Sequence, residues 1–472
     1  MTHVLTALGN RWDSRVATLL EGSREVTIVR RCADLLDLVA TAAAGLGTVA
    51  LVSSDLRGLD LTVVAQLRTA GVHVVGIAAH GDEESERRLH QLGISRVVPG
   101  GAELAEFEAA LAQEAAATAD ATLDALERDL GQHLDHALDD EHSFDFSHVP
   151  EPAGMRDAAP SLGGPAGAAA GVPVASPVDA PVDGPPDDGL DGATGRVVAV
   201  WGPTGAPGRT TVAVTMATEL ARLGIPTVLV DADTYGGSVA QALSFLDEAP
   251  GIAAATRSAD QGTLDLPNLA RLAPVATAGL RVLTGIPKAE RWPEIRPAAL
   301  ERVLTLCRAL GQVVVVDCGF NLEDDEELSY DTMAPRRNAA TLTTLALADE
   351  VVVVGGCDPV GLQRLVRGLQ ELQTVQAPRP TVCVNRVRSG AVGSNPEQRV
   401  SEALSRFAGV TEVLFVPDDP AALDTALLEG RALAECAPQS PVRPAVRSIA
   451  EKVAGAPAGS GRRRRRGRRV SR

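Results

Sequence analysis

The chain has 472 residues and a formal net charge of −17. This length exceeds what a single hydrophobic core usually organises, so we expect about two or three domains. Apolar residues make up 45% of the chain and aromatic residues only 3%, a composition typical of an α/β protein. All eight histidines lie at or before His148, which excludes a histidine-based triad or a histidine-ligated metal from the rest of the chain.

Positive charge is concentrated at the C-terminus, where residues 462–472 carry eight arginines and leave a charge of −25 on the remainder. Residues 457–472 are expected to be a disordered tail. Its charge density suits nucleic-acid phosphates or an anionic membrane surface. The acidic linker of the same chain is an alternative partner. Lysine is nearly absent, being confined to Lys288 and Lys452.

The six cysteines show no CxxC spacing and mostly fall in apolar runs. This pattern favours reduced core thiols in a cytoplasmic protein over a disulfide framework or a metal site. The N-terminus lacks a basic region followed by an apolar core, so no signal peptide is predicted. The weakly polar stretch 35–52 is interrupted by Asp37 and two glycines, and we expect no transmembrane segment.

Strand and helix patterns alternate over residues 1–115, which predicts a small doubly wound parallel sheet. The expected strands are 3–8, 25–30, 48–53, 72–78 and 95–98. The order resembles a response-regulator receiver domain, with Asp55 where the phospho-acceptor would lie. Gly9 and Asn10 replace the acidic pair of that family, and Val98 replaces its lysine. We therefore predict an atypical receiver-like domain that serves docking or dimerisation.

Residues 116–194 are expected to connect two domains. Leucines recur every three or four residues from Leu123 to Leu138, which predicts a helix with one apolar face. That face either packs on its own domain, the favoured interpretation, or associates with a second copy. The Ala/Pro/Gly/Asp-rich sequence that follows has too little apolar surface to fold, which predicts a flexible linker.

Strand and helix patterns return over residues 195–456, beginning with a strand at 197–201, the turn GPTGAPG and a helix at 210–223. Glycines allow backbone N–H groups to converge on an anion, and a helix N-terminus adds its positive dipole end. Gly205 and Gly208 are placed for such a phosphate loop. Pro203 occupies the usual first glycine position and Arg209 the usual lysine position, whereas Thr210 retains the magnesium-binding hydroxyl.

Acidic residues follow the buried strands of this region. Asp231 and Asp233 come after the strand at 227–230, and Asp317 comes after the strand at 312–316. In open parallel sheets, ligands bind beyond the carboxyl ends of the strands. We expect these carboxylates to lie beside the phosphate loop.

Five motifs, GPTGAPGRTT, VLVDAD, VVVVDCG, VCVNRV and FVPDDP, occur in the order and spacing found in the MinD/ParA superfamily of deviant Walker A, P-loop ATPases. Together with the receiver-like domain, they make the chain similar to the CpaE/TadZ branch of localisation factors. The resemblance implies a MinD-like NTPase domain at 195–456 with ATP and Mg²⁺ as cofactors.

The resemblance also implies roles for individual residues. Asp233 would orient the attacking water, supported by Asp231. Thr210 would bind magnesium directly, and Asp317 would hold it through water. The remaining nucleotide contacts would come from Gly205, Ala206, Pro207, Gly208, Arg209, Thr210 and Thr211 at the phosphates, from Asn385 at the adenine edge and from Pro417 and Asp418 against the base.

Two departures bear on catalysis. The superfamily lysine that reaches the partner's phosphates in a dimer corresponds to Thr204, and the loop lysine corresponds to Arg209. Because positive charge on the transferring phosphoryl group dominates this chemistry, hydrolysis is expected to be weak.

The resulting hypothesis is a nucleotide-dependent homodimer that positions a septal, pilus or secretion assembly, located in the cytoplasm or peripherally at the membrane, pole or septum. Two alternatives stay open: a pseudo-ATPase scaffold without turnover, and a ParA-like ATPase that partitions DNA.

Overall fold

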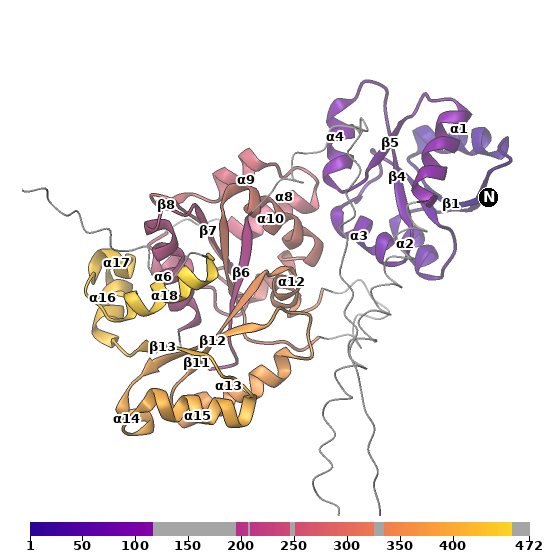
Figure 1. Ribbon diagram of the computed structural model, residues 1–472. Helices are drawn as coiled ribbons and strands as arrows, with labels where there is room; N and C mark the ends of the chain where they lie inside the picture. Colours follow the sequence, from indigo (N-terminus) through magenta and orange to yellow (C-terminus); the bar gives the residue numbers. More distant parts are fainter. Residues whose placement is uncertain (117–194, 206–207, 246–250, 325–334, 456–472) are drawn as a thin grey trace, which may run out of the picture. The chain divides into compact units, whose positions relative to one another are not determined.

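The computed structural model describes residues 1–116, 195–205, 208–245, 251–324 and 335–455 (Figure 1). The predicted leucine-striped helix, the predicted linker and the arginine-rich tail lie outside these residues, as do Ala206 and Pro207 of the loop.

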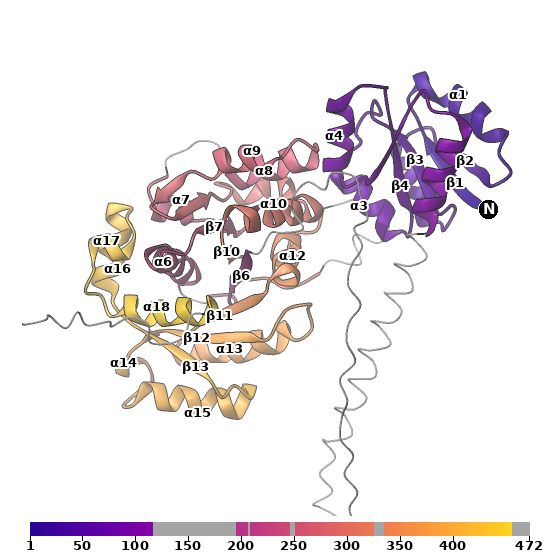
Figure 2. The same ribbon diagram turned by 45° about the horizontal axis from the view of Figure 1, so that its top comes forward.

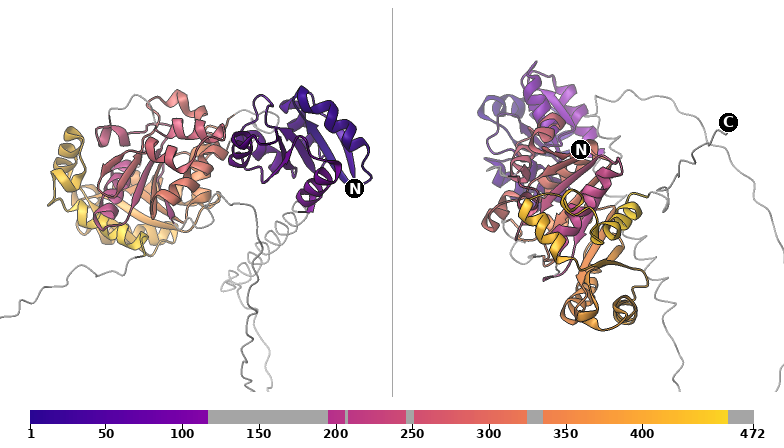
Figure 3. Two further views of the ribbon diagram at one scale, coloured as in Figure 1. Left: turned by 90° about the horizontal axis from the view of Figure 1, so that it is seen from above. Right: turned by 90° about the vertical axis from the view of Figure 1, so that its left-hand side faces the viewer.

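The N-terminal residues form a five-stranded parallel sheet in the order β2-β1-β3-β4-β5. These residues are the indigo and purple part of Figure 3. The strands are β1 (Thr2–Ala7), β2 (Val26–Arg31), β3 (Val49–Ser53), β4 (His73–Ala78) and β5 (Arg96–Pro99). The helices are α1 (Asn10–Glu21), α2 (Leu35–Ala43), α3 (Leu61–Thr69) and α4 (Glu83–Gln91), followed by a helix at residues 104–116. Separate apolar clusters form on the two faces, so the predicted doubly wound arrangement is confirmed.

Asp55 lies two residues beyond β3 and is exposed. A Cβ atom on Gly9, two residues after β1, would come within 2.6 Å of its carboxylate oxygens, so a side chain there would displace the Asp55 carboxylate. The backbone N–H of Gly9 donates to the Ser53 hydroxyl at 2.8 Å. The turn after β1 is thus joined to the end of β3 through the backbone of Gly9.

The C-terminal residues form an eight-stranded sheet in the order β13-β12-β11-β6-β10-β7-β9-β8. All neighbours pair in parallel except β8 and β9, which are antiparallel. The strands are β6 (Arg196–Trp201), β7 (Thr227–Ala232), β8 (Val275–Thr277), β9 (Leu280–Leu283), β10 (Val313–Cys318), β11 (Glu350–Gly356), β12 (Pro380–Val387) and β13 (Val413–Pro417). Its central strands are buried along their length, as expected for strands covered on both faces.

Helices cover both faces of this sheet. The face opposite α6 is covered by α8 (Gly251–Asp260), α9 (Leu266–Leu272), α10 (Pro297–Leu310), α12 (Ala339–Leu347), α13 (Pro359–Leu372) and α15 (Pro396–Ala408). The other face is covered by α6 (Arg209–Arg222), α7 (Val239–Ala242), α16 (Pro420–Glu429), α17 (Leu433–Cys436) and α18 (Val442–Val453). Figure 2 shows α18 alongside α6. Short helical turns at η1 (Ala289–Glu294) and α14 (Ser389–Val392) complete the described elements.

The predicted α/β class with parallel sheets is confirmed. The structure adds the antiparallel β8–β9 edge and the helices between residues 251 and 296, which the sequence pattern did not predict. No helix among the described residues is long and apolar enough to cross a membrane.

Candidate functional site

The candidate site lies where β6, β7 and β10 end. β10 pairs with β6 on one side and with β7 on the other, and its register sets Asp317 beside Asp231. Both carboxylates belong to the last residues of their strands, so the strands run slightly further than predicted. Strands that follow β6 in the chain lie on both sides of it in the sheet, so the carboxyl end of β6 is a topological switch point. Ligands bind at such points in open parallel sheets.

The loop after β6 reaches α6 through two left-handed glycines. Gly205 has a φ of +66°, and Gly208, which precedes the first turn of α6, has a φ of +94°. A side chain at Gly208 would also collide with the amide of Asn385. With glycine as its N-cap, α6 has no side-chain cap, and its first N–H groups are left for an anion.

Arg209 at the start of α6 is held from two sides. Its Nη1 donates to the carbonyl of Gly202 at 3.0 Å, and its Nη2 donates to Oδ2 of Asp233 at 3.3 Å. The side chain is only 15% exposed, and its Nε is buried without a partner among the described residues. The loop cation is therefore directed inward, toward the carboxylates.

Thr210 and Asp317 form the shortest contact described here between the loop and the sheet. The hydroxyl of Thr210 donates to Oδ2 of Asp317 at 2.6 Å. Asp317 is fully buried, and its Oδ1 has no partner in the described part of the chain. Burial, followed by the nearby charge of Asp231, raises the pKa of Asp317 well above its ordinary value, although the Thr210 hydrogen bond opposes that shift.

Asp231 and Asp233 are both buried, but their environments differ. Asp231 accepts the backbone N–H groups of Asp233 at 3.2 Å and Val239 at 3.0 Å. Burial is the main cause that raises the pKa of Asp231 to about 7, and the charge of Asp233 adds to it. Asp233 uses Oδ1 to accept N–H groups of the following turn, whereas Oδ2 receives Arg209. Asp233 is thus the carboxylate that faces the loop cation.

The predicted base-binding residues are only partly brought to the loop. Asn385, 4% exposed and two residues before the end of β12, places its amide against Gly208. Pro417 ends β13, and the adjacent Asp418 accepts a hydrogen bond from Arg388 at 3.0 Å. No described contact joins these last two residues to the loop. Thr211 lies in the first turn of α6.

Residues that sequence reasoning missed also shape the site. Arg337 donates to the hydroxyl and the carbonyl of Thr234, at 3.0 and 3.1 Å, and lies 3.9 Å over the Tyr235 ring. It thereby braces the turn after Asp233. Gly285 leaves room for the Asp231 carboxylate, which a Cβ atom there would approach within 2.8 Å. Neither contact leaves a local signal in the sequence, because each joins segments more than 50 residues apart.

The residues present fit a magnesium-bound polyphosphate. The described residues contain no cluster of His, Cys, Asp and Glu side chains able to hold a metal by itself. Magnesium, however, is usually held by one or two protein groups together with substrate phosphates and waters. The Thr210 hydroxyl and the unpartnered Oδ1 of Asp317 supply such groups beside an uncapped helix N-terminus.

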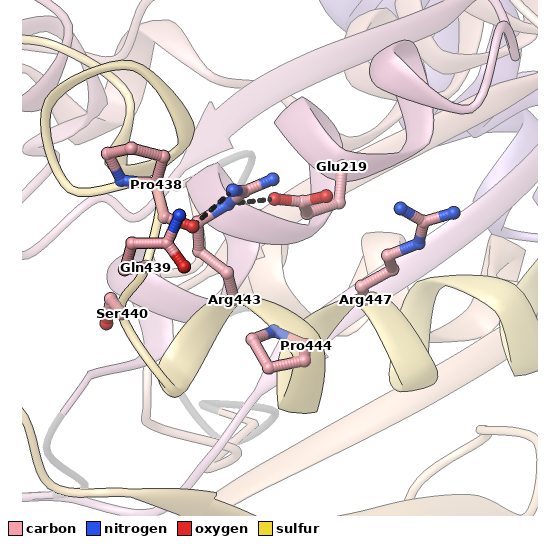
Figure 4. A pocket seen from close by; sticks show the side chains of 7 residues that line it. All are labelled: Glu219, Pro438, Gln439, Ser440, Arg443, Pro444 and Arg447. Carbon is pink, nitrogen blue, oxygen red and sulfur yellow. Dashed lines mark hydrogen bonds and ion pairs between the residues drawn. The ribbon is translucent and has the colours of Figure 1, made fainter.

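A surface pocket of about 290 Å³ lies near the other end of α6 (Figure 4). It is lined by Glu219, Pro438, Gln439, Ser440, Arg443, Pro444 and Arg447. Glu219 follows Thr210 by nine residues, which corresponds to about 13 Å along a helix. In the pocket, Nε of Arg443 donates to Oε1 of Glu219 at 2.7 Å, and this contact fixes α18 on α6. The pocket is therefore separate from the phosphate loop.

No protein-family model matches the chain, and no curated protein matches it. Solved structures that are similar include a ParA family ATPase from Chlorobium tepidum, 18% identical over 54% of this chain and 98% of that one, with a TM-score of 0.46. The cell division ATPase MinD of Pyrococcus furiosus is 18% identical over 55% of this chain and 98% of its own, with a TM-score of 0.43. The septum site-determining protein MinD of Pyrococcus horikoshii, solved with Mg-ADP, is 17% identical over 55% and 95%, with a TM-score of 0.42.

Proposed function

We propose that the C-terminal α/β part of the chain binds ATP with Mg²⁺ at the loop between β6 and α6, as a MinD/ParA-type P-loop ATPase. The observation that carries this proposal is the contact of Thr210 with Asp317 beside an uncapped helix N-terminus reached through left-handed glycines. Phosphate oxygens would accept the N–H groups of the first turn of α6.

The bound magnesium would neutralise charge on the phosphates. Thr210 would be its direct ligand, and Asp317 would hold it through water. Asp233 would orient the attacking water, because its Oδ2 faces the loop. Asp231, buried behind it, would hold the turn by accepting backbone N–H groups. Asn385, beside Gly208, would read the adenine edge, with Pro417 and Asp418 against the base.

Hydrolysis in this proposal is weak. The superfamily lysine is replaced by Thr204, which has no charge, and Arg209 already binds Asp233 and a backbone carbonyl. The cation and the water-orienting carboxylate must separate before either serves the reaction. The same pairing favours the second candidate, a pseudo-ATPase scaffold that binds nucleotide without turnover.

For the whole chain we propose a CpaE/TadZ-like spatial regulator that dimerises with ATP and positions a septal, pilus or secretion assembly. The receiver-like sheet would dock a protein partner, and the arginine-rich tail would bring the chain to nucleic acid or anionic lipid. The tail's eight arginines also support a ParA-like role in DNA partition. Location in the cytoplasm, or peripherally at the membrane, pole or septum, follows from either role.

The test is the melting temperature of the full chain with Mg²⁺ alone, ATP alone and both together. Mg-ATP should raise it, because a ligand that binds only the folded state stabilises that state. Thr210→Ala should remove the magnesium-dependent part of the shift. Thr305→Ala is the matched control, since Thr305 on α10 also donates a hydroxyl hydrogen bond, at 2.9 Å, to the carbonyl of Glu301. A parent chain without any Mg-ATP shift would refute nucleotide binding.

A further inference from the structure

Acidic side chains outnumber basic ones in the cluster beside the loop. Asp231, Asp233 and Asp317 are buried together, and among the described residues Arg209 is the cation that contacts this cluster. The position next to Gly205 is Thr204, which brings no charge. A polyphosphate would add further negative charge to the same place. A further cation from outside the loop, in addition to the magnesium, would therefore strengthen binding of the phosphates.

Helix α13 places an arginine against the loop. The guanidinium of Arg364 lies over Gly205: a Cβ atom built on that glycine would be 3.1 Å from Cζ and 3.8 Å from Nε, and nearer still to Nη1. One helical turn further, Gly368 packs on the residues that lead into the loop, since a Cβ there would be 2.9 Å from Pro203. The same face of α13 thus fixes the loop and carries the arginine.

Arg364 is exposed and makes no hydrogen bond or ion pair with any described residue. It differs in this from Arg209, which is bonded on two sides. A guanidinium has several donors in a planar fork that matches the oxygens of a phosphate. Arg364 lies beside the loop, and no described protein group uses its donors. Its guanidinium is therefore placed to bind a phosphate.

We propose that Arg364 binds phosphate oxygens of the nucleotide at the Gly205 end of the loop and supplies the positive charge that Thr204 does not. This inference rests on the proposed nucleotide binding. It adds a phosphate-binding residue on an element that lies more than 150 residues after the loop in the sequence. It also gives Gly205 a second role, because any side chain there would displace the guanidinium.

The experiment measures binding by the full chain, in magnesium, of ATP, inorganic tripolyphosphate and adenosine, each as a competitor of a fluorescent ATP analogue. Arg364→Gln removes the charge, and Arg364→Lys retains it. Arg379→Gln is the control, since Arg379 is exposed and directly precedes the first residue of β12. It therefore lies at the end of the sheet where the parallel strands begin, whereas the phosphate loop lies where they end. Arg364→Gln should weaken ATP and tripolyphosphate about tenfold or more, as expected for hydrogen bonds to charged groups, and leave adenosine unchanged. Arg364→Lys should recover part of the loss, and Arg379→Gln should match the parent.

The outcomes separate this inference from the proposed function. If the parent binds ATP and Arg364→Gln binds it equally well, Arg364 is not a phosphate ligand, whereas nucleotide binding stands. If Arg364→Gln weakens adenosine as much as tripolyphosphate, the effect is on the shape of the site and the inference fails. If the parent binds neither ATP nor tripolyphosphate, both proposals fail together.

Discussion

Arg209 and Asp233 hold each other across the candidate site, with 3.3 Å between Nη2 of the arginine and Oδ2 of the aspartate. The arginine also donates to the carbonyl of Gly202. A lysine at this position would be a compact point charge without the fork that makes both contacts at once. Arg209, the loop cation, is thus bonded to the carboxylate that the resemblance assigns to water activation.

The first prediction concerns Arg209→Lys. This change should raise ATP hydrolysis about tenfold above a near-background parent rate, which corresponds to about 1.4 kcal/mol of barrier, because the carboxylate is released and the lysine reaches the phosphates. Steady-state phosphate release measures it. Adding Asp233→Asn to the lysine variant should return the rate to background. A parent that already turns over as fast as the lysine variant would contradict the prediction.

The second prediction separates the magnesium role of Asp317 from a structural one. Asp317→Asn keeps the size of a fully buried carboxyl whose pKa burial has raised. The melting temperature without nucleotide should therefore not fall. The gain in ATP affinity on adding magnesium should decline about tenfold or more, the loss typical of groups that hold metals through another ligand. Calorimetric titration with and without magnesium measures it, and an unchanged magnesium dependence would remove Asp317 from the site.

The sequence predicted those parts of the fold and site that depend on local pattern. Val313 to Val316 could be recognised as a buried strand because of its continuous apolar run, and the end of that strand located Asp317. The N-terminal sheet followed from alternating strands and helices. The region around β8 and β9 was missed because both strands are short: β8 is a three-residue, largely exposed strand at the edge of the sheet, and β9 has four residues, too few for a clear apolar repeat.

Contacts between distant segments were not predictable in the same way. Arg364 is one of many arginines in a sequence that nearly lacks lysine, so its residue type carried no signal. Its place beside Gly205 depends on how α13 packs on the loop. The Arg209–Asp233 pair likewise depends on the register of neighbouring strands. The sequence identified both residues, but it did not indicate that they bind each other.

The third prediction is a pH dependence of stability. The pKa of Asp231 is raised to about 7 from an ordinary value of 3.8, mainly by burial. Between about pH 4 and 7 the folded chain retains a proton that the unfolded chain loses, so stability falls as pH rises, by at most about 1.4 kcal/mol per pH unit. Above pH 7 this contribution is constant. Unfolding of the nucleotide-free chain should depend less steeply on pH in Asp231→Asn than in the parent, and equal slopes would contradict the assignment.

The fourth prediction concerns the tail. Deleting residues 462–472 removes eight arginines. Binding of the full chain to duplex DNA or anionic vesicles should lose its steep dependence on salt, because fewer counterions are released. Neutral vesicles are the control, and Mg-ATP binding should be unchanged. Equal, salt-sensitive binding with and without the tail would show that other residues make these contacts.

The fifth prediction tests the ion pair that fixes α18 on α6. Glu219 is 1% exposed, and Arg443 is its ion-pair partner at 2.7 Å. Arg443→Met should lower the free energy of unfolding by about 3–5 kcal/mol, because it leaves a buried carboxylate without its cation.

Arg447 lines the same pocket, but its ion pair with Glu451 is exposed. Arg447→Met should therefore lower the free energy of unfolding by less than about 1 kcal/mol. Combining Arg443→Met with Glu219→Leu should restore most of the loss, because no buried charge then remains. Denaturant unfolding of the four chains measures these differences, and a double variant as unstable as Arg443→Met would show that packing, rather than the charge pair, holds the helices together.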